Sequence, residues 1–148
     1  MRPRKRKIIL CVDDNLEVLK SLRLQLRQHL NREFRIVLAE GSEDALKTLE
    51  SLELSRNDTL LIVSDWLMPN INGEDLIKII EQRWGQILTI VLSGHITPEA
   101  KQRLVSLQQV LSVMSKPWDG KILTNLITNS LLEKEESNLD NSNIGGPL

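Results

Sequence analysis

The sequence predicts an α/β domain in which a five-stranded parallel sheet is covered by helices on both faces. Two observations support this doubly wound fold class. Short apolar runs alternate with amphipathic stretches about five times along the 148 residues, and parallel strands need the crossover connections that helices provide. The chain is also long enough to bury a core, and its 41% apolar and 26% charged residues are typical of a globular protein.

The first strand and helix are predicted from a change in hydrophobic period. The run Lys7–Val12 is short and nearly all apolar, which indicates a strand buried on both faces. A helix should follow from Asn15 to about Leu30, with Asp14 or Asn15 as its cap. The apolar residues that recur there at helical spacing are Val18, Leu19, Leu22, Leu26 and Leu30.

The second and third units repeat this order of strand and helix. The second unit has a strand at Phe34–Ala39 and a helix from about Ser42 to Leu52. The apolar stripe of that helix is formed by Ala45, Leu46 and Leu49. The third unit has a strand at Thr59–Ser64, a loop, and a helix from about Gly73 to Arg83.

The fourth and fifth units complete the sheet. A strand at Ile87–Leu92 precedes a helix that begins at Thr97-Pro98, because threonine caps helices and proline suits the first turn. A strand at Val110–Met114 precedes a helix from about Asp119 to Glu136. We expect the apolar side chains of this last helix to face inward, namely Ile122, Leu123, Leu126, Ile127 and Leu131.

The two ends of the chain lie outside the predicted domain, which we place at residues 7–132. The first seven residues carry five positive charges and no acid, so the remainder carries a net charge of −6. We interpret residues 1–6 as a solvated basic leader and expect no nucleic-acid partner, because such a surface needs basic residues on a folded face. Residues 133–148 should be disordered, since Ser137–Leu148 is rich in Asn, Ser and Gly.

The composition of the chain also indicates the cellular compartment of the protein. No run of 18 apolar residues is present, so we expect no membrane span. The single cysteine, Cys11, cannot form an internal disulfide and lies in a predicted buried strand. We therefore expect a reducing cytoplasm and an inert core thiol.

Polar residues that directly follow the apolar runs form the candidate site. They are Asp13, Asp14, Asp65, Ser93 and Lys116. Ligands bind beyond the carboxyl ends of parallel strands, so these side chains should converge. Three converging carboxylates call for a hard divalent cation such as Mg²⁺, and the lysine and hydroxyl supply donors for an anion. This set predicts phosphoryl transfer to a carboxylate nucleophile.

Four motifs in this order resemble the receiver family of two-component response regulators, from about Lys7 to Leu132. They are Asp13-Asp14, the segment Asp65-Trp-Leu-Met-Pro-Asn-Ile-Asn-Gly73, Ser93-Gly94 and Lys116-Pro117. The resemblance implies a flavodoxin-like sheet with strand order 2-1-3-4-5 and five helices. It also implies a signalling role, in which the domain catalyses only its own phosphorylation and dephosphorylation.

The resemblance assigns a role to each residue of the site. Asp65 corresponds to the phosphoacceptor, and Asp13 and Asp14 to the acidic pair that holds Mg²⁺ with Asp65 and the backbone carbonyl of Leu67. Ser93 corresponds to the hydroxyl that hydrogen-bonds the phosphoryl group, and Lys116 to the lysine that pairs with it. The implied partners are a histidine kinase or histidine phosphotransfer protein and a downstream effector protein, with a homodimer as one option.

Two segments depart from the common family pattern. Receivers often carry an aromatic residue three positions before the lysine, where this chain has Val113. We therefore expect phosphorylation to be transmitted by backbone shifts, or the output to differ. The segment Lys116-Pro-Trp-Asp119 resembles receivers attached to histidine kinases or cyclic-dinucleotide phosphodiesterases.

The residues that would position the hydrolytic water are also unusual. Two positions after Asp65 the chain has Leu67, which has no polar group to hold a water. Two positions after Ser93 it has His95, which can orient a water, cover the phosphoryl group or simply lie in a surface loop. We expect the leucine to dominate and dephosphorylation to be slow.

Other interpretations remain for some of these residues. A haloacid-dehalogenase-type phosphatase also forms an aspartyl-phosphate, but it needs a second aspartate where this chain has Leu67. A pseudo-receiver would act without phosphorylation, and the complete acidic set argues against it. As purely structural roles, Asp13 and Asp14 can cap the first helix, and Ser93 can begin a turn with Gly94.

The aromatic and histidine residues give weaker expectations. Trp66 should lie partly exposed near the site, and Trp84 should pack at the end of its helix. His29 and His95 have no second ligand at a useful spacing, which argues against zinc.

Overall fold

The computed structural model describes residues 5–131, and a single parallel sheet runs through them. Its strands are β1 (Lys7–Val12), β2 (Phe34–Ala39), β3 (Thr59–Asp65), β4 (Leu88–Ser93) and β5 (Val110–Ser115). Every neighbouring pair is parallel, and the order is β2-β1-β3-β4-β5. The predicted fold class and strand order are confirmed.

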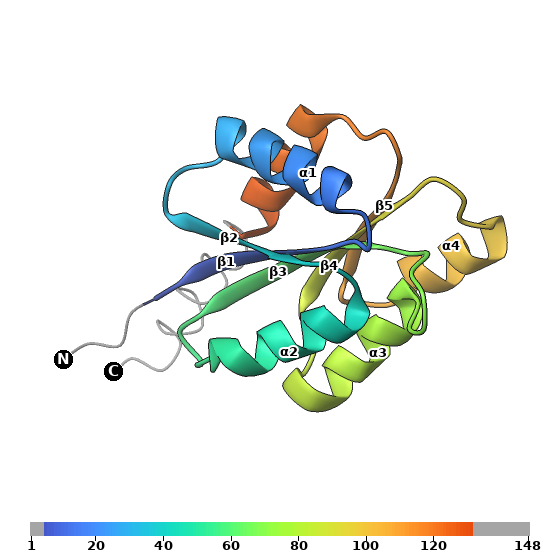
Figure 1. The fold of residues 1–148 in the computed structure, drawn as a ribbon, viewed down its shortest axis with the longest axis horizontal. Coiled ribbons are helices and arrows are strands. Elements are labelled where there is room, and N and C mark those ends of the chain that lie inside the picture. Colours follow the sequence, from blue (N-terminus) through green and yellow to red (C-terminus); the bar gives the residue numbers. More distant parts are fainter. Residues whose placement is uncertain (1–4, 132–148) are drawn as a thin grey trace, which may run out of the picture.

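Helices cover both faces of the sheet (Figure 1). They are α1 (Leu16–His29), α2 (Ser42–Leu52), α3 (Gly73–Trp84), α4 (Pro98–Val105) and a fifth helix described over residues 120–131. Figure 1 shows α1 and the fifth helix on one face and α2 and α3 on the other. Among residues 5–131, no helix is long and apolar enough to cross a membrane.

The sheet divides the core because successive side chains of a strand point to opposite faces. From β1, Ile9 and Cys11 pack under α1 and the fifth helix, whereas Ile8 and Leu10 pack under α2 and α3. Cys11 is fully buried, and burial raises the pKa of its thiol to about 12. The thiol therefore stays protonated at neutral pH, as expected of an inert core residue.

A smaller apolar cluster lies between α3, β4, α4 and β5, and we call it the α4 cluster. Its buried members are Ile77, Val91, Leu104 and Val110, and the partly buried side chains packed against them are Trp66, Ile96, Leu107 and Val113. This cluster joins the residue after Asp65 to α4 and the edge strand β5.

The helix caps agree with the sequence predictions. Asn15 caps α1, since its side chain accepts hydrogen bonds from the N–H groups of Glu17 and Val18. Of the two candidates named from the sequence, Asp14 and Asn15, it is Asn15 that occupies the cap position. Thr97 caps α4 as predicted, and Pro98 is its first residue.

Some predicted bounds were wrong by one residue. β4 was predicted to end at Leu92 and β3 at Ser64, but Ser93 and Asp65 are still paired within the sheet, opposite Ser115 and Leu92 respectively. Backbone pairing with the neighbouring strand therefore sets the strand end, and the polarity of the side chain does not.

The fifth helix differs from its prediction at one side chain. Ile122 was expected to face inward but is 58% exposed. The buried stripe runs through Leu123, Ile127 and Leu131, four residues apart, and Ile122 lies about 100° away around the helix. The predicted helix end at Glu136 and the predicted disordered tail at residues 133–148 lie outside the described residues, as do residues 1–4 of the leader.

Arg6, the last residue of the predicted solvated leader, is bound to the folded domain. Its guanidinium donates hydrogen bonds to both carboxylate oxygens of Asp58, at 3.1 and 2.7 Å, and to the carbonyl of Leu52 at 2.8 Å. The Asp58 side chain is only 2% exposed. Hydrogen bonds from Arg6 lower the pKa of Asp58 to about 2 despite its burial, with a further contribution from the N–H of Ser55. Arg6 thus fixes the start of β1 beside the turn that precedes β3.

We predict that Asp58→Asn lowers the midpoint of thermal unfolding by about 3–6 °C at pH 7. Because the folded-state pKa lies below the ordinary value of 3.8, this stabilisation is fully present above pH 3.8 and is lost as the pH falls through about 2. Thermal unfolding of both proteins between pH 7 and pH 2 measures this difference. Glu33→Gln, which removes an exposed carboxylate paired with Lys7, should change little and serves as the control. Equal midpoints for Asp58→Asn and the parent at pH 7 would contradict the role of Arg6.

Candidate functional site

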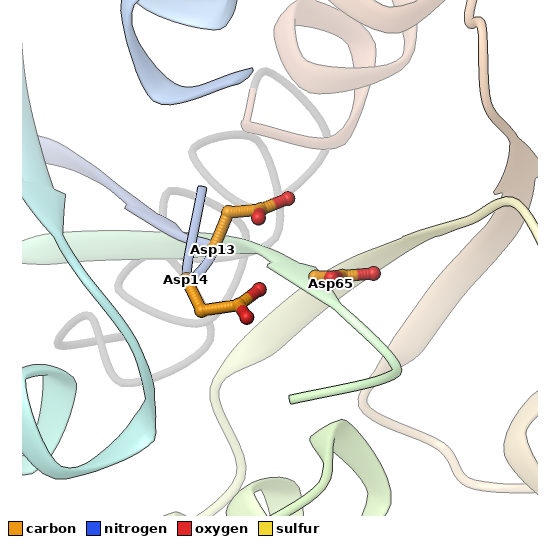
Figure 2. Close-up of side chains that lie close together, drawn as sticks. All are labelled: Asp13, Asp14 and Asp65. Atoms are coloured by element: carbon orange, nitrogen blue, oxygen red, sulfur yellow. The ribbon is translucent and has the colours of Figure 1, made fainter. Parts of the chain in front are cut away.

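Three carboxylates meet at the carboxyl end of the sheet (Figure 2). Asp13 and Asp14 directly follow β1, and Asp65 is the last residue of β3. Because β1 and β3 are paired neighbours, one oxygen of each side chain lies within 4.8 Å of the others. Within residues 5–131, this is the only group of three or more acidic, histidine or cysteine side chains spaced to hold a metal ion. The convergence predicted from the sequence is present.

The three carboxylates differ in their access to water. Asp13 and Asp65 are 3% and 8% exposed, whereas Asp14 is exposed. The cluster is therefore open to solvent on the side of Asp14. A cation that enters there would keep some of its water ligands, which is the usual behaviour of Mg²⁺.

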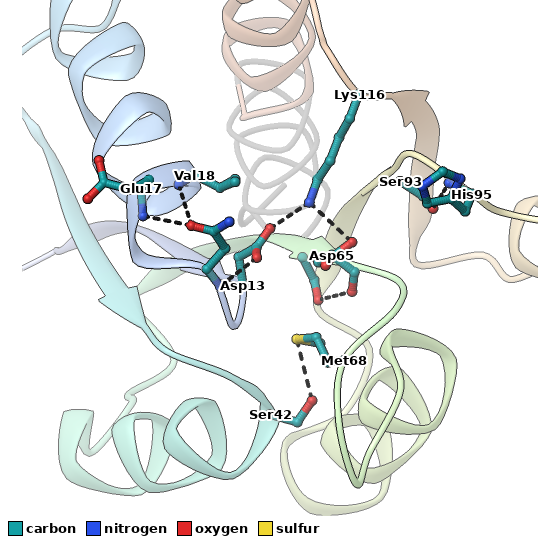
Figure 3. A network of polar contacts seen from close by, with 11 residues as sticks. Asp13, Glu17, Val18, Ser42, Asp65, Met68, Ser93, His95 and Lys116 are labelled. Carbon is teal, nitrogen blue, oxygen red and sulfur yellow. Dashed lines mark hydrogen bonds and ion pairs between the residues drawn. The ribbon is translucent and has the colours of Figure 1, made fainter.

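Lys116 joins the two buried carboxylates (Figure 3). Its Nζ lies 2.7 Å from Asp13 Oδ2 and 3.3 Å from Asp65 Oδ1. The residue follows β5, and its backbone N–H donates to the carbonyl of Ser93 at 3.0 Å. Its peptide bond to Pro117 is cis. The side chain thus reaches from the end of β5 across β4 to the carboxylates on β1 and β3, as the sequence predicted.

The electrostatics of the cluster follow from burial and mutual contact. Burial and the charge of Asp13 raise the pKa of Asp65, although Lys116 and the backbone N–H of Leu67 oppose the shift. Burial alone would lower the pKa of Lys116, but its hydrogen bond to Asp13 and the charges of both aspartates outweigh this and raise it. With the carboxylates ionised, the cluster carries a net charge of −2, which a divalent cation would balance.

Ser93 belongs to the same edge of the sheet but does not join the cluster. It is the last residue of β4 and is 4% exposed. Its Oγ accepts a hydrogen bond from the backbone N–H of His95 at 3.2 Å, and in the described chain no side-chain hydrogen bond links it to Asp65 (Figure 3). The turn with Gly94 that the sequence allowed is therefore formed.

The loop after Asp65 is held by close backbone contacts. The N–H of Gly73 donates to the carbonyl of Trp66 at 2.7 Å. A Cβ at Gly73 would lie 2.5 Å from the carbonyl oxygen of Asp65 and 2.9 Å from the Cα of Trp66. Only glycine allows this approach without displacement of the backbone.

Ser42 also supports the loop that follows Asp65, and the sequence did not indicate this role. Its hydroxyl donates to the carbonyl of Ile71 at 2.7 Å and lies 3.8 Å from the Sδ of the buried Met68 (Figure 3). Ser42 is the first residue of α2, so a serine there looks like an ordinary helix start. A local sequence pattern cannot reveal a contact between two residues that are nearly thirty positions apart in the chain.

The predictions for the remaining residues have mixed outcomes. Trp84 packs against the core at the end of α3, as predicted. Trp66 adjoins the site and is partly exposed, as predicted, but its ring packs into the α4 cluster. Leu67 has a side chain that is 59% exposed, and its carbonyl stays a predicted metal ligand.

Comparison with known proteins now identifies the family. The family model described as the response regulator receiver domain matches residues 9–128. The chain belongs to the response regulator receiver family. The order of motifs, the strand order and the acidic cluster of this receiver agree with that assignment.

Two curated relatives are transcriptional regulators. The hydrogenase transcriptional regulatory protein HoxA of Cupriavidus necator is 28% identical over 77% of this chain and 22% of its own length. The DNA-binding transcriptional regulator NtrC of Proteus hauseri is 29% identical over 88% of this chain and 26% of its own length. The receiver thus spans about a quarter or less of these relatives.

Solved structures support the fold. A response regulator receiver protein from Pseudomonas putida is 28% identical, with a TM-score of 0.72 over 86% of this chain and 99% of that one. The receiver domain of a putative LuxO repressor protein from Vibrio parahaemolyticus has a TM-score of 0.76 at 19% identity, over 96% and 99% of the two chains. At that identity, the second comparison shows the fold alone.

We predict that Gly73→Ala lowers the free energy of unfolding by about 1–3 kcal/mol, because the added Cβ overlaps the backbone of Asp65 and Trp66. The displaced carboxylate of Asp65 should also weaken Mg²⁺ binding at least about tenfold. Denaturant unfolding and a calorimetric Mg²⁺ titration measure the two effects. At Gly94 a Cβ has no neighbour closer than 4.0 Å, so Gly94→Ala is the matched control. Equal Mg²⁺ affinity in the parent and Gly73→Ala would show that this close approach does not position Asp65.

Proposed function

We propose that this receiver accepts a phosphoryl group on Asp65 from a histidine kinase or histidine phosphotransfer protein and then signals through a downstream protein. The observation that carries the proposal is the Lys116 ammonium between the buried carboxylates of Asp13 and Asp65. This arrangement offers a carboxylate nucleophile, a cation for a phosphoryl oxygen and a carboxylate set for a metal in one place. The domain has no substrate other than the donor.

We propose that Mg²⁺ binds to Asp13, Asp14, Asp65 and the carbonyl of Leu67. The all-oxygen ligand set, the net charge of −2 and the exposed side of Asp14 support this choice of ion. When bound, the ion would neutralise charge on the transferred phosphoryl group.

The chain's own residues account for the transfer as follows. An oxygen of Asp65 forms a bond to phosphorus as the bond between phosphorus and the donor imidazole nitrogen breaks, and the imidazole leaves. Lys116 stays protonated and moves its contact from the Asp65 carboxylate to a phosphoryl oxygen. Ser93 leaves the N–H of His95 and donates its hydroxyl to another phosphoryl oxygen.

We propose that the output surface comprises α4, β5 and the fifth helix, roughly residues 97–132. Ser93 leads directly into the loop before α4, so its movement acts first on that helix. A downstream effector protein would bind this surface. Because Cys11 is a buried free thiol, we propose a reducing cytoplasmic compartment, with the domain at residues 7–132.

The two other functions gain no support. A haloacid-dehalogenase-type phosphatase needs an acid at position 67, where an exposed leucine stands. A pseudo-receiver has no use for a complete carboxylate cluster paired with a lysine.

We predict that acetyl phosphate with Mg²⁺ adds one phosphoryl group to the protein and that Asp65→Asn abolishes the addition. Asp14→Ala should raise the Mg²⁺ concentration that the reaction requires, because it removes the exposed ligand. Intact-mass spectrometry measures the extent of labelling. Asp75→Asn, an exposed acid of α3 outside the cluster, is the control and should be labelled like the parent. Full labelling of Asp65→Asn would sink the assignment of the phosphoacceptor.

We predict that Leu67→Asn speeds loss of the phosphoryl group by about tenfold, because an amide can hold the attacking water where leucine cannot. Leu67 is 59% exposed, so the substitution removes little packing. His95→Ala should have the smaller effect. The measurement is decay of the phosphorylated protein after the donor is removed, at constant Mg²⁺. If Leu67→Asn decays no faster than the parent, water positioning at this residue does not limit the reaction.

A further inference from the structure

Trp66 connects the phosphoacceptor to the α4 cluster. Its backbone N–H donates to the carbonyl of Leu92 at 3.3 Å, and its carbonyl accepts from the N–H of Gly73 at 2.7 Å. These bonds hold the backbone between β4 and the start of α3. From there the side chain packs against the α4 cluster, beside elements that include β4, α4 and β5. The indole therefore lies where a change at Asp65 would be passed to α4.

The indole N–H of Trp66 is buried and has no acceptor. It is the only buried side-chain nitrogen or oxygen without a hydrogen bond among the residues that the structure describes. The indole N–H of Trp118, in contrast, donates to the side chain of Gln25. A buried donor without an acceptor is unfavourable, and an exception in a native fold calls for a physical reason. The indole N–H of Trp66 is thus a donor that an acceptor brought close to it would satisfy.

The α4 cluster has a small residue at the position where receivers often carry the switching aromatic. Val113 is only partly buried and packs against the same cluster as the indole. Ile96, in the loop between β4 and α4, packs there too. Rearrangement of this loop would therefore change the surroundings of the indole.

We propose that Trp66 is the aromatic switch of this receiver, and that its indole N–H gains a backbone acceptor from the loop of residues 94–96 when Asp65 is phosphorylated. The inference rests on the proposed function. In the unphosphorylated state, Ser93 holds this loop in its turn by accepting from the N–H of His95. When Ser93 turns to the phosphoryl group, that bond breaks and the loop is free to move. Since the new hydrogen bond exists only in the active conformation, it favours that conformation.

The indole N–H signals in a ¹H–¹⁵N NMR spectrum test this directly. The protein contains three tryptophans, so Trp66→Phe, Trp84→Phe and Trp118→Phe assign the three signals. With Mg²⁺, beryllofluoride should move the Trp66 indole proton downfield and slow its exchange with solvent. The Trp84 signal, from the end of α3 outside the proposed output surface, should stay in place and serves as the internal control.

The outcomes separate this inference from the proposed function. Backbone shifts at Asp14 and Ser93 with an unmoved Trp66 indole signal would overturn the inference and leave the phosphoacceptor role intact. No shift at any residue with beryllofluoride would overturn the proposed function, and this inference with it.

A second measurement uses affinity. Trp66→Phe keeps an aromatic ring but removes the N–H, so it should weaken beryllofluoride binding by about five- to tenfold. Trp84→Phe, which alters a tryptophan at the end of α3 that packs against a different cluster, should bind like the parent. Equal affinities for the two variants would contradict the proposal. If Trp66→Phe does not fold, the NMR measurement on the parent protein decides alone.

Discussion

Asp13 and Asp65 lie side by side with little access to water, and their repulsion has to be offset by a nearby cation. Lys116 provides it, at 2.7 and 3.3 Å from the two carboxylates. This contact depends on the relative positions of four strands. β1 and β3 must be neighbours to bring the carboxylates together, and β5 must end two strands from β3 so that the lysine reaches across β4. Removal of the lysine would leave an uncompensated buried charge, which proteins tolerate poorly.

The same edge of the sheet combines a rigid part with a part able to move. The rigid part is the loop after Asp65, where Gly73 lies against the backbone and Ser42 bonds to Ile71. The movable part follows β4, where the hydroxyl of Ser93 accepts a hydrogen bond from the N–H of His95 that a phosphoryl group could replace. A nucleophile needs fixed geometry, whereas a signal needs an element with two arrangements. The unpaired indole N–H of Trp66 lies between these two parts.

Sequence reasoning succeeded where the signal is local. Thr97 and Pro98 gave the start of α4, and the alternation of apolar runs gave five strands in the right places. It failed where neighbours in space decide. Ile122 was expected to face inward, but it is exposed because three other apolar residues of its helix fill the buried stripe.

The sequence by itself determined the fold class and the identity of the cluster residues, because hydrophobic period and ordered motifs carry that information. The strand order followed from the resemblance of those motifs to the receiver family. Only the tertiary structure decided that Arg6 binds Asp58, that Ser93 faces His95 and that the N–H of Trp66 is buried without an acceptor. Two of these features depend on contacts between segments far apart in the chain. The third depends on whether the Ser93 hydroxyl meets the backbone N–H of His95 or the side chain of Asp65. Burial and hydrogen-bond partners are set by the packed neighbours, and these exist only once the chain has folded.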